Sequence, residues 1–289
     1  MTWTHYRLRF RLLSPLHVGY RKVGNLMQTR PYVPGKNVWA ALTARLTRDY
    51  HNGGDAEMYK CIGRLVQENF RFGYLWPSLD GNEPYFPWKH DDFDYLFLGS
   101  YASTALNYEQ GAADEGLLHE VEFIAPVTRD RQPVYLVGDL WVKKGDIPVE
   151  IREQVLSNLQ LGGERHYGWG RVRCCTDWDE KQEGSGQTVA GYHWNEQNEE
   201  VVLTLSKDND KDKARLTAHA KAVGSDALSG IVGPIEPLVG WERNNDANAK
   251  NPWKLSSAVV CWAPGGRVKQ EIQVRIGDSG IWKLFKRES

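Results

Sequence analysis

The densest group of residues that could do chemistry lies in one glycine-rich segment, residues 161–172. Its glycines Gly163, Gly168 and Gly170 allow the backbone to turn and a ligand to come close to main-chain N–H groups. Between them stand cationic and aromatic side chains: Arg165, His166, Tyr167, Trp169 and Arg171. Such side chains neutralise phosphates and stack on unpaired bases. The segment therefore predicts a nucleic-acid contact, and a plain tight turn is the alternative that the same glycines allow.

Two other kinds of glycine-rich site are excluded by their chemistry. A P-loop needs Gly-Lys followed by Ser or Thr, which residues 161–172 lack. A dinucleotide-binding turn lies between a strand and a helix, whereas a helix is expected just before these glycines.

A second candidate contact lies between residues 13 and 46. Lys36 and Asn37 stand at the expected start of a helix, with Asn37 as its N-cap. A helix N-terminus offers free N–H groups and the positive end of the helix dipole, which together favour a phosphate. Arg45 extends the positive charge along the same helix. Most helix starts bind nothing, so this segment supports a phosphate contact only when it is taken together with residues 161–172.

Histidines are the candidates for acid–base chemistry. His17 and His166 lie in the two candidate segments, and a histidine can act as general acid or base on a ribose 2′-hydroxyl. Residues 14–36 contain no Asp or Glu. The other histidines are scattered, and the four cysteines form no Cys-x-x-Cys pair. We therefore expect no metal site and no cofactor.

The elements that must position these residues are suggested by hydrophobic periodicity. Alternation over residues 6–12 predicts a strand with Arg7, Arg9 and Arg11 on one face, where a solvated sheet surface is the plain alternative. Helical spacing follows over 37–50 and 58–65, and then an irregular, acidic insertion over about 71–118. Two apolar runs, 121–125 and 134–142, predict a hairpin, and 151–159 predicts a helix. This order suits a ferredoxin-like βαββαβ unit, which leaves one sheet face free.

The rest of the chain predicts a second, smaller unit. Residues 177–192 are rich in acids, Gly, Ser and Gln and predict a linker. Residues 193–289 contain strand-like runs at 201–205, 258–263, 272–276 and 281–285, and a possible helix over 211–223. The predicted fold class is therefore α+β, with one ferredoxin-like unit over 1–176 and a divergent second unit over 193–289.

Composition sets limits on the kind of protein. The net charge is −1, which argues against binding nucleic acid by overall charge. The charge is nevertheless uneven: residues 1–50 hold nine Lys or Arg and one acid, whereas residues 51–120 hold twelve acids and four bases. A local basic surface therefore remains possible. The absence of a signal peptide or a long apolar stretch predicts a soluble, cytoplasmic protein.

Three motifs taken together resemble the RAMP superfamily of CRISPR-associated proteins. They are L-x-P-L-H-V-G at 13–19, P-Y-V-P-G-K-N at 31–37 before a helix ending A-A-L-T-A-R-L, and the loop G-x-x-x-x-G-x-G-R at 163–171. The resemblance covers about residues 5–175 and thins beyond residue 195. It departs from the family where Lys36, Asn37 and Ala40 replace two serines and a glycine, so local backbone contacts are expected to differ.

The resemblance implies a guide-RNA (crRNA) binding subunit of a type III CRISPR-Cas interference complex that takes part in antiviral defence. Target-cutting members carry an aspartate in the loop matched by residues 14–36, which has none here. The length and the loop position are similar to those of the subunit that caps the 5′ handle beside the large signalling subunit. The expected partners are guide RNA, backbone RAMP subunits and that large subunit. The expected RNA-binding residues are His17, Lys36, Asn37, Arg45, Gly163, Arg165, His166, Tyr167, Gly168, Trp169, Gly170 and Arg171.

Two alternatives stay open. One is a metal-independent endoribonuclease that processes repeat RNA with His17 or His166. The other is a structural backbone or adaptor subunit, in which the glycine-rich segment is a turn against another protein chain.

Overall fold

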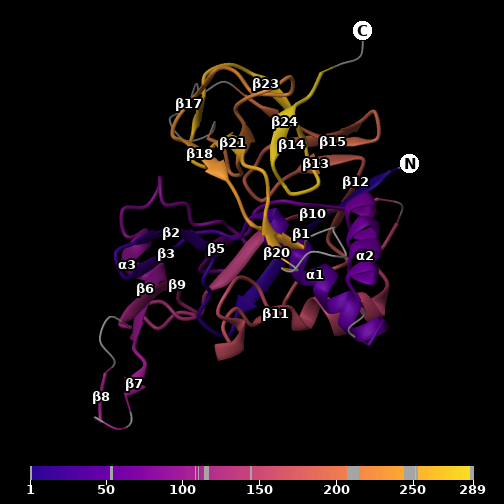
Figure 1. Cartoon of the computed structure of the whole chain (residues 1–289). Coiled ribbons are helices and arrows are strands. Elements are labelled where there is room, and N and C mark those ends of the chain that lie inside the picture. Colours follow the sequence, from indigo (N-terminus) through magenta and orange to yellow (C-terminus); the bar gives the residue numbers. More distant parts are fainter. Residues whose placement is uncertain are drawn as a thin grey trace.

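The computed structural model describes residues 2–52, 55–107, 109, 111–113, 117–143, 145–206, 215–243, 251 and 253–286. It confirms the predicted mixed α+β class. Among the described residues there are two hydrophobic cores, one between the first sheet and its helices and the other between the outer face of that sheet and the C-terminal strands. The C-terminal strands lie together on one side of the first sheet (Figure 1).

The first sheet contains four strands in the order β11-β1-β10-β4, and two further strands pair with its members. β1 (Trp3–Leu12) lies antiparallel to β10 (Tyr135–Lys143) and to β11 (Val172–Cys174). β4 (Phe70–Phe72) and β5 (Trp76–Ser78) pair with β10, and β12 (Lys181–Glu183) pairs with β1. Leu8 and Phe10 of β1 point into the first core, as the period-2 pattern predicts. The first predicted strand is therefore confirmed.

Helices cover the core side of this sheet. α1 (Gly35–Tyr50) buries Val38 and Leu42, and α2 (Ala56–Asn69) adds Val66. The predicted helix over 151–159 takes an irregular form, a π turn η1 (Ile151–Val155) followed by a 3-10 turn η2 (Leu156–Asn158). Its apolar residues Val155, Leu156 and Leu159 are still buried. The pattern therefore identified the buried face but not the helix type.

The predicted hairpin of 121–125 and 134–142 is wrong. β9 (His119–Ile124) pairs with β3 (Leu26–Thr29) and β6 (Leu98–Ser103) in a separate sheet of order β2-β3-β9-β6, whose other edge is β2 (Gly19–Val23). The turn is present, because Thr128 N donates to Gln132 O over 2.9 Å. The pairing extends only to a hydrogen bond from Val134 N to Pro126 O over 3.1 Å, because Pro126 and Pro133 supply no N–H to a longer ladder.

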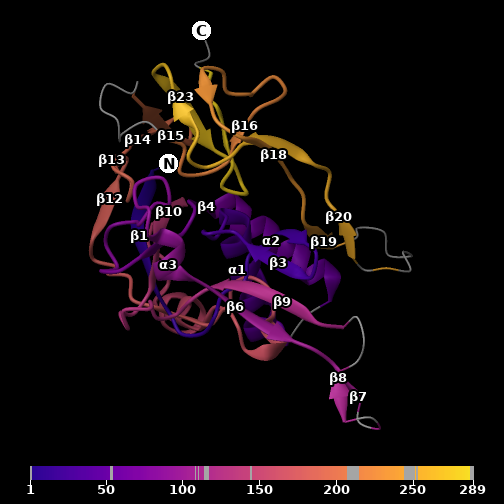
Figure 2. The same ribbon diagram turned by 90° about the vertical axis from the view of Figure 1, so that its left-hand side faces the viewer.

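The acidic insertion divides between the two sheets. Its first residues form β4 and β5 of the first sheet. Beyond them come α3 (Phe93–Phe97), the strand β6, and a small hairpin of β7 (Leu106–Asn107) and β8 (Ala112–Ala113). β6 and β9 carry this hairpin away from the body of the protein (Figure 2).

The C-terminal strands form an eight-stranded sheet of order β13-β14-β15-β23-β24-β16-β21-β18. These strands are β13 (Ser185–Gln187), β14 (His193–Gln197), β15 (Glu200–Leu205), β16 (Ala220–Lys221), β18 (Ile235–Leu238), β21 (Val259–Trp262), β23 (Ile272–Ile276) and β24 (Trp282–Leu284). Two short pairs accompany it: β17 (Ile231–Val232) with β22 (Arg267–Val268), and β19 (Trp241–Arg243) with β20 (Trp253–Leu255).

Two local predictions for this region fail. The predicted linker 177–192 contains β12, which joins the first sheet, and β13, which joins the second. The predicted helix over 211–223 is absent from residues 215–223, where Leu216, Ala218 and Ala220 alternate toward the second core. Residues 211–214 lie outside the described part of the chain. Small apolar residues with a period of two fit an extended backbone better than a helix.

The outer face of the first sheet is not free, contrary to the ferredoxin-like expectation. Trp3, Trp76 and Trp141 of this sheet belong to the second core. A buried polar cluster joins the two units: Tyr74 Oη donates to His219 Nδ1 over 2.7 Å, and Arg30 donates to Glu236 over 2.8 Å. Part of the sheet face that could meet a ligand is therefore used to hold the C-terminal unit.

Candidate nucleic-acid interface

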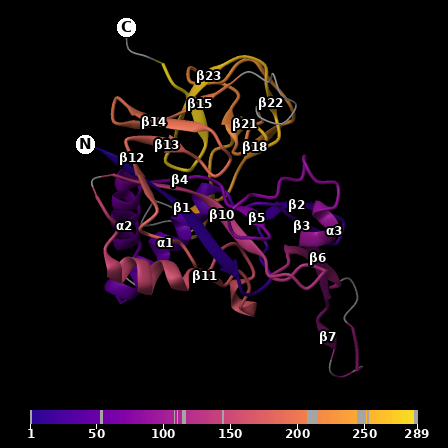
Figure 3. The same cartoon turned by 180° about the vertical axis from the view of Figure 1, so that it is seen from behind.

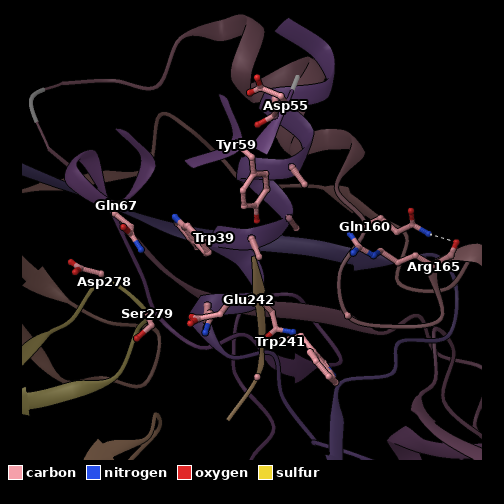
Figure 4. Close-up of a pocket in the computed structure, with 18 of the residues that line it drawn as sticks. Trp39, Asp55, Tyr59, Gln67, Gln160, Arg165, Trp241, Glu242, Asp278 and Ser279 are labelled. Carbon is pink, nitrogen blue, oxygen red and sulfur yellow. Dashed lines mark hydrogen bonds between the residues drawn. The ribbon is translucent and has the colours of Figure 1, made fainter. Parts of the chain in front are cut away.

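A cleft of about 1200 Å³ opens where four parts of the chain meet. One wall is α1, another is α2, and the remaining walls come from the glycine-rich segment and from C-terminal loops (Figure 4). β18 leads from the C-terminal sheet to the β19–β20 pair, which brings residues 240–242 down beside α1 and α2 (Figure 2). The polar and aromatic lining residues are Lys36, Asn37, Trp39, Asp55, Tyr59, Gln67, Gln160, Arg165, Trp241, Glu242, Asn251, Asp278 and Ser279.

The start of α1 supplies one cationic side of the cleft. The helix begins at Gly35 after Pro34, so the predicted N-cap Asn37 lies inside the first turn. No side chain among the described residues caps this end, and the first turn contains no acid. Lys36 and Asn37 therefore stand at the positive end of the helix dipole and line the cleft.

Close packing fixes the position of this helix end. A Cβ on Gly35 would lie 2.6 Å from the carbonyl oxygen of Phe72 and 3.1 Å from the Cα of Gly280. Only glycine allows the β4 strand and the loop before β24 to come so near. The start of α1 is thereby held against both units.

Three aromatic side chains face the cleft. Tyr59 of α2 and Trp39 of α1 lie on one side, and Trp241 of β19 lies on the other (Figure 4). Trp39 is half-buried and donates its ring N–H to Gly63 O over 3.0 Å, whereas Trp241 is 65% exposed. Flat rings on opposite sides of a groove are suitable platforms for unpaired bases.

The acids of the cleft are already engaged within the protein. Asp55 caps α2 by accepting from Met58 N over 2.8 Å. Asp278 pairs with Arg71 at 3.3 Å, and Glu242 lies 3.7 Å from Lys254. In contrast, neither Lys36 nor Arg165 forms an ion pair within the described residues. The charge that remains available to a ligand is therefore positive.

The glycine-rich segment folds as a tight, exposed turn. Glu164 adopts a left-handed conformation (φ 53°), a short 3-10 turn η3 covers Arg165–Tyr167, and Gly168 is again left-handed (φ 78°). Gln160 braces the turn by donating to the carbonyl oxygens of Arg165 and Trp169 over 3.0 and 2.9 Å. Arg165, His166 and Tyr167 are exposed at the tip, Tyr167 to 80%.

The N–H groups of the three predicted glycines do not face a ligand, although the sequence predicts that they contact phosphate. Gly163 N donates to His17 O over 2.8 Å, Gly168 N to Arg165 O over 3.0 Å, and Gly170 N to Pro15 O over 2.7 Å. These three N–H groups are therefore satisfied inside the chain and do not face a phosphate. The exposed side chains of Arg165, His166 and Tyr167 remain available to a ligand.

Steric space explains why glycines are needed here. A Cβ on Gly162 would lie 2.3 Å from His17 O, and a Cβ on Gly170 would lie 1.8 Å from Leu161 O. At Gly168 there is open space, so the requirement is its positive φ alone. The glycines thus serve to dock the turn onto residues 15–17.

His17 is part of that docking surface. Its side chain is 8% exposed, and Nδ1 donates to the carbonyl oxygen of Glu122 over 2.7 Å. A carbonyl only accepts, so Nδ1 carries a proton and Nε2 is the remaining polar atom. His17 does not line the cleft.

The predicted site residues divide into two groups. Lys36, Asn37 and Arg165 line the cleft, and Gly163 is next to the lining residue Gly162. The others lie outside it. Arg45 pairs with Asp49 and donates to Asn158 O, and the Trp169 ring packs edge-on against the Phe123 ring with 5.2 Å between centroids. Arg171 is exposed directly before β11. His17, Gly170, His166, Tyr167 and Gly168 also lie outside the lining.

Several lining residues were not predicted. Trp39 fits the apolar pattern of its helix and suggests core packing. Tyr59 is half-buried on the same side of α2 as Gly63 and Val66, and it belongs to no motif. Trp241 lies in a region where the family resemblance is thin. Their common feature, convergence on one cleft, arises only from long-range folding.

Two further searches of the described residues gave negative results. No cluster of three or more His, Cys, Asp or Glu could hold a metal ion in this part of the chain. Among the same residues, no helix combines the length and the apolar character needed to cross a membrane.

Comparisons with known proteins give fold-level likeness only. No protein-family model and no curated protein matches the chain. Chains of three solved structures are similar to it. One, from "Type III-B Cmr-beta bound to cognate target RNA", has 10% identity and a TM-score of 0.40, covering 60% of this chain and 96% of that chain. One from the apo state of Type III-B Cmr-beta has 11% identity and a TM-score of 0.42, covering 61% and 98%. A third, from Type III-B Cmr-beta bound to target RNA and AMPPnP, has 12% identity and a TM-score of 0.48, covering 91% and 86%.

Proposed function

We propose that this chain is a guide-RNA-binding subunit of a type III CRISPR effector complex, and that it caps the 5′ handle of the guide without cutting RNA. The observation that carries the proposal is the cleft, where Lys36 and Arg165, which form no ion pair with any residue that the structure describes, meet three aromatic rings. Two of the three RAMP-like motifs, at the start of α1 and in the glycine-rich turn, contribute to its walls.

The cleft suits a short, irregular stretch of single-stranded RNA. Lys36 and Arg165 can each contact a phosphate, while the rings of Tyr59 and Trp241 can stack on bases. Asn37, Gln67 and Ser279 add amide and hydroxyl groups that can bond to base edges or to the ribose 2′-hydroxyl.

Binding of a handle-sequence RNA by the purified chain tests this proposal. The double variant Lys36→Ala with Arg165→Ala should bind a labelled handle RNA more weakly than wild type, and the slope of log K against log salt should fall by about 1.4, at about 0.7 per lost phosphate contact. The matched control is Arg64→Ala with Lys269→Ala, two exposed cations outside the cleft. An equal affinity and slope in the two double variants would overturn the proposal.

The absence of cleavage is tested separately. Repeat RNA incubated with the protein in excess chelator should remain intact. Cleavage that is lost in His17→Ala or in His166→Ala would instead make the chain a metal-independent endoribonuclease.

A further inference from the structure

Four arginines form a row on the face of the first sheet that points away from α1 and α2. Arg7, Arg9 and Arg11 alternate along β1 with residues of the first core, so their side chains leave the opposite face. Arg11 is paired directly with Arg173 of β11. We call these four residues the arginine row. β1 and β10 cross the middle of the view from behind (Figure 3).

The fold neutralises little of this charge. Within the described residues, the row forms one ion pair, between Arg9 and Glu180 at 3.2 Å, and the Glu180 side chain is 57% exposed. Asp139 lies opposite Arg7 in the β1–β10 ladder, but its Oδ1 accepts from His5 Nε2 at 2.8 Å and from Val189 N at 2.9 Å.

The neighbouring acids do not change this picture. Asp177 and Asp179 follow β11 in the chain, and neither forms an ion pair with the row in the part of the chain that the structure describes. Asp177 instead accepts from the backbone N of Asp179 over 3.0 Å.

Two features of the row are unfavourable for the isolated chain. Arg11 and Arg173 stand directly opposite each other, and like charges in that position repel. The Nε of Arg7 is buried and finds no hydrogen-bond acceptor among the described residues. The repulsion between Arg11 and Arg173 would be relieved by a bound polyanion, because both side chains are exposed and it supplies acceptors and negative charge at once.

The spacing of the row suits a nucleic-acid backbone. Alternate residues of a strand lie about 6.6 Å apart, since the rise per residue is about 3.3 Å. That separation is comparable to the distance between successive phosphates of an extended single strand. Arginine binds phosphate through two parallel N–H groups, which adds a geometric preference. Tyr135 of β10, half-buried and directly opposite Arg11, places an aromatic ring at the end of the row.

We propose that the arginine row is a second site for the phosphates of single-stranded RNA, separate from the cleft. No residue of the row lines the cleft, whose walls are α1, α2, the glycine-rich turn and the C-terminal loops. The two sites lie on different sides of the first sheet, so one RNA segment in the cleft leaves the row free for another. An acidic segment of a partner protein is the competing occupant, and Tyr135 together with the phosphate-like spacing favours RNA over it.

The test is a salt titration of oligouridylate binding in two backgrounds. The row variant is Arg9→Ala, Arg11→Ala and Arg173→Ala, and its charge-matched control is Arg64→Ala, Arg267→Ala and Lys269→Ala, three exposed cations elsewhere. Each set is made in wild type and in the cleft variant Lys36→Ala with Arg165→Ala. Melting curves check that every variant folds.

We expect the cleft variant to keep weak binding that depends on salt. Adding the row substitutions should remove it, and in the wild-type background they should lower the slope of log K against log salt by about 2, at about 0.7 per contact. If the row variant does not fold, Arg11→Ala with Arg173→Ala should lower that slope by about 1.4.

The proposal is overturned if the row and control variants share one affinity and one slope in both backgrounds. It is also overturned if the row substitutions weaken the binding of polyglutamate but leave the binding of RNA unchanged. An unchanged affinity in the cleft variant bears on the cleft and not on the row, whereas complete loss of binding in the cleft variant counts against the row, so the two proposals fail separately.

Discussion

The buried cluster around Glu236 gives a prediction that can be worked through from the structure. Glu236 of β18 accepts from Arg30 at 2.8 Å and from His219 Nε2 at 2.5 Å, and His219 is fully buried. Burial alone would raise the pKa of Glu236, but the hydrogen bonds from His219 and Arg30 lower it from 4.5 to about 2. That difference corresponds to about 3 kcal/mol of stability, at about 1.36 kcal/mol per pKa unit.

The direction of the pH dependence follows from the sign of the shift. Because the folded-state pKa of Glu236 lies below its unfolded value of 4.5, the stabilisation is complete above pH 4.5 and is lost as the pH falls toward about 2. Burial lowers the pKa of His219 below 6.5, so its contribution to the free energy of unfolding is also lost as the pH falls. The cluster should therefore weaken in acid.

The perturbation is Glu236→Gln, followed by urea unfolding at several pH values. At pH 7 the variant should be less stable than wild type by about 3 kcal/mol, and at pH 3 by less than half of that, since the carboxylate of the unfolded wild-type chain is then mostly protonated whereas the folded one is still ionised. The control Glu57→Gln removes a carboxylate that is 78% exposed beside Lys60, and it should cost less than about 1 kcal/mol. An equal stability difference for Glu236→Gln at pH 7 and pH 3 would refute the reasoning.

Two further outcomes follow from the site. Gly170→Ala should destabilise the protein by more than about 2 kcal/mol in thermal unfolding, because the new Cβ would lie 1.8 Å from Leu161 O. Gly168→Ala should cost about 1 kcal/mol, because Gly168 has a similar φ but open space around it. Equal costs for the two variants would contradict the packing role of Gly170. Trp241→Ala should weaken RNA binding by about 1–3 kcal/mol in anisotropy titrations without lowering the salt slope, and an unchanged affinity would remove Trp241 from the interface.

Local patterns predicted what local forces decide. The alternation of Tyr6, Leu8 and Phe10 along β1 follows from one buried face, and it places the strand and its arginines correctly. The start of α1 was predicted within three residues, because proline and glycine precede the predicted start. Lys36 and Arg165 were predicted as neighbours of one ligand, and both line the cleft.

The failures concern partners that are distant in the sequence. Nothing in residues 121–125 shows that their strand pairs with β3 and β6 instead of with the run that follows the next turn. The glycines of residues 161–172 were assigned to phosphate contact, whereas the close neighbour is the backbone of residues 15–17. A glycine shows that something approaches closely, but the sequence does not say what it is.

The sequence also did not show that the C-terminal unit covers part of the sheet face that a ferredoxin-like unit leaves open. Trp3 and Trp141 fit any apolar strand pattern, and only the tertiary structure shows that they pack against the C-terminal unit. The aromatic lining of the cleft has the same origin, since Tyr59 and Trp241 come together through the path of β18 and β19.

Ultraviolet crosslinking of RNA within the particle that co-purifies with this chain tests the central claim most directly. We expect crosslinked peptides that contain Tyr59 or Trp241, together with the turn that carries Arg165, and a loss of these crosslinks in the Lys36→Ala, Arg165→Ala variant. Crosslinks confined to surfaces far from the cleft, or a particle that contains no RNA, would contradict it.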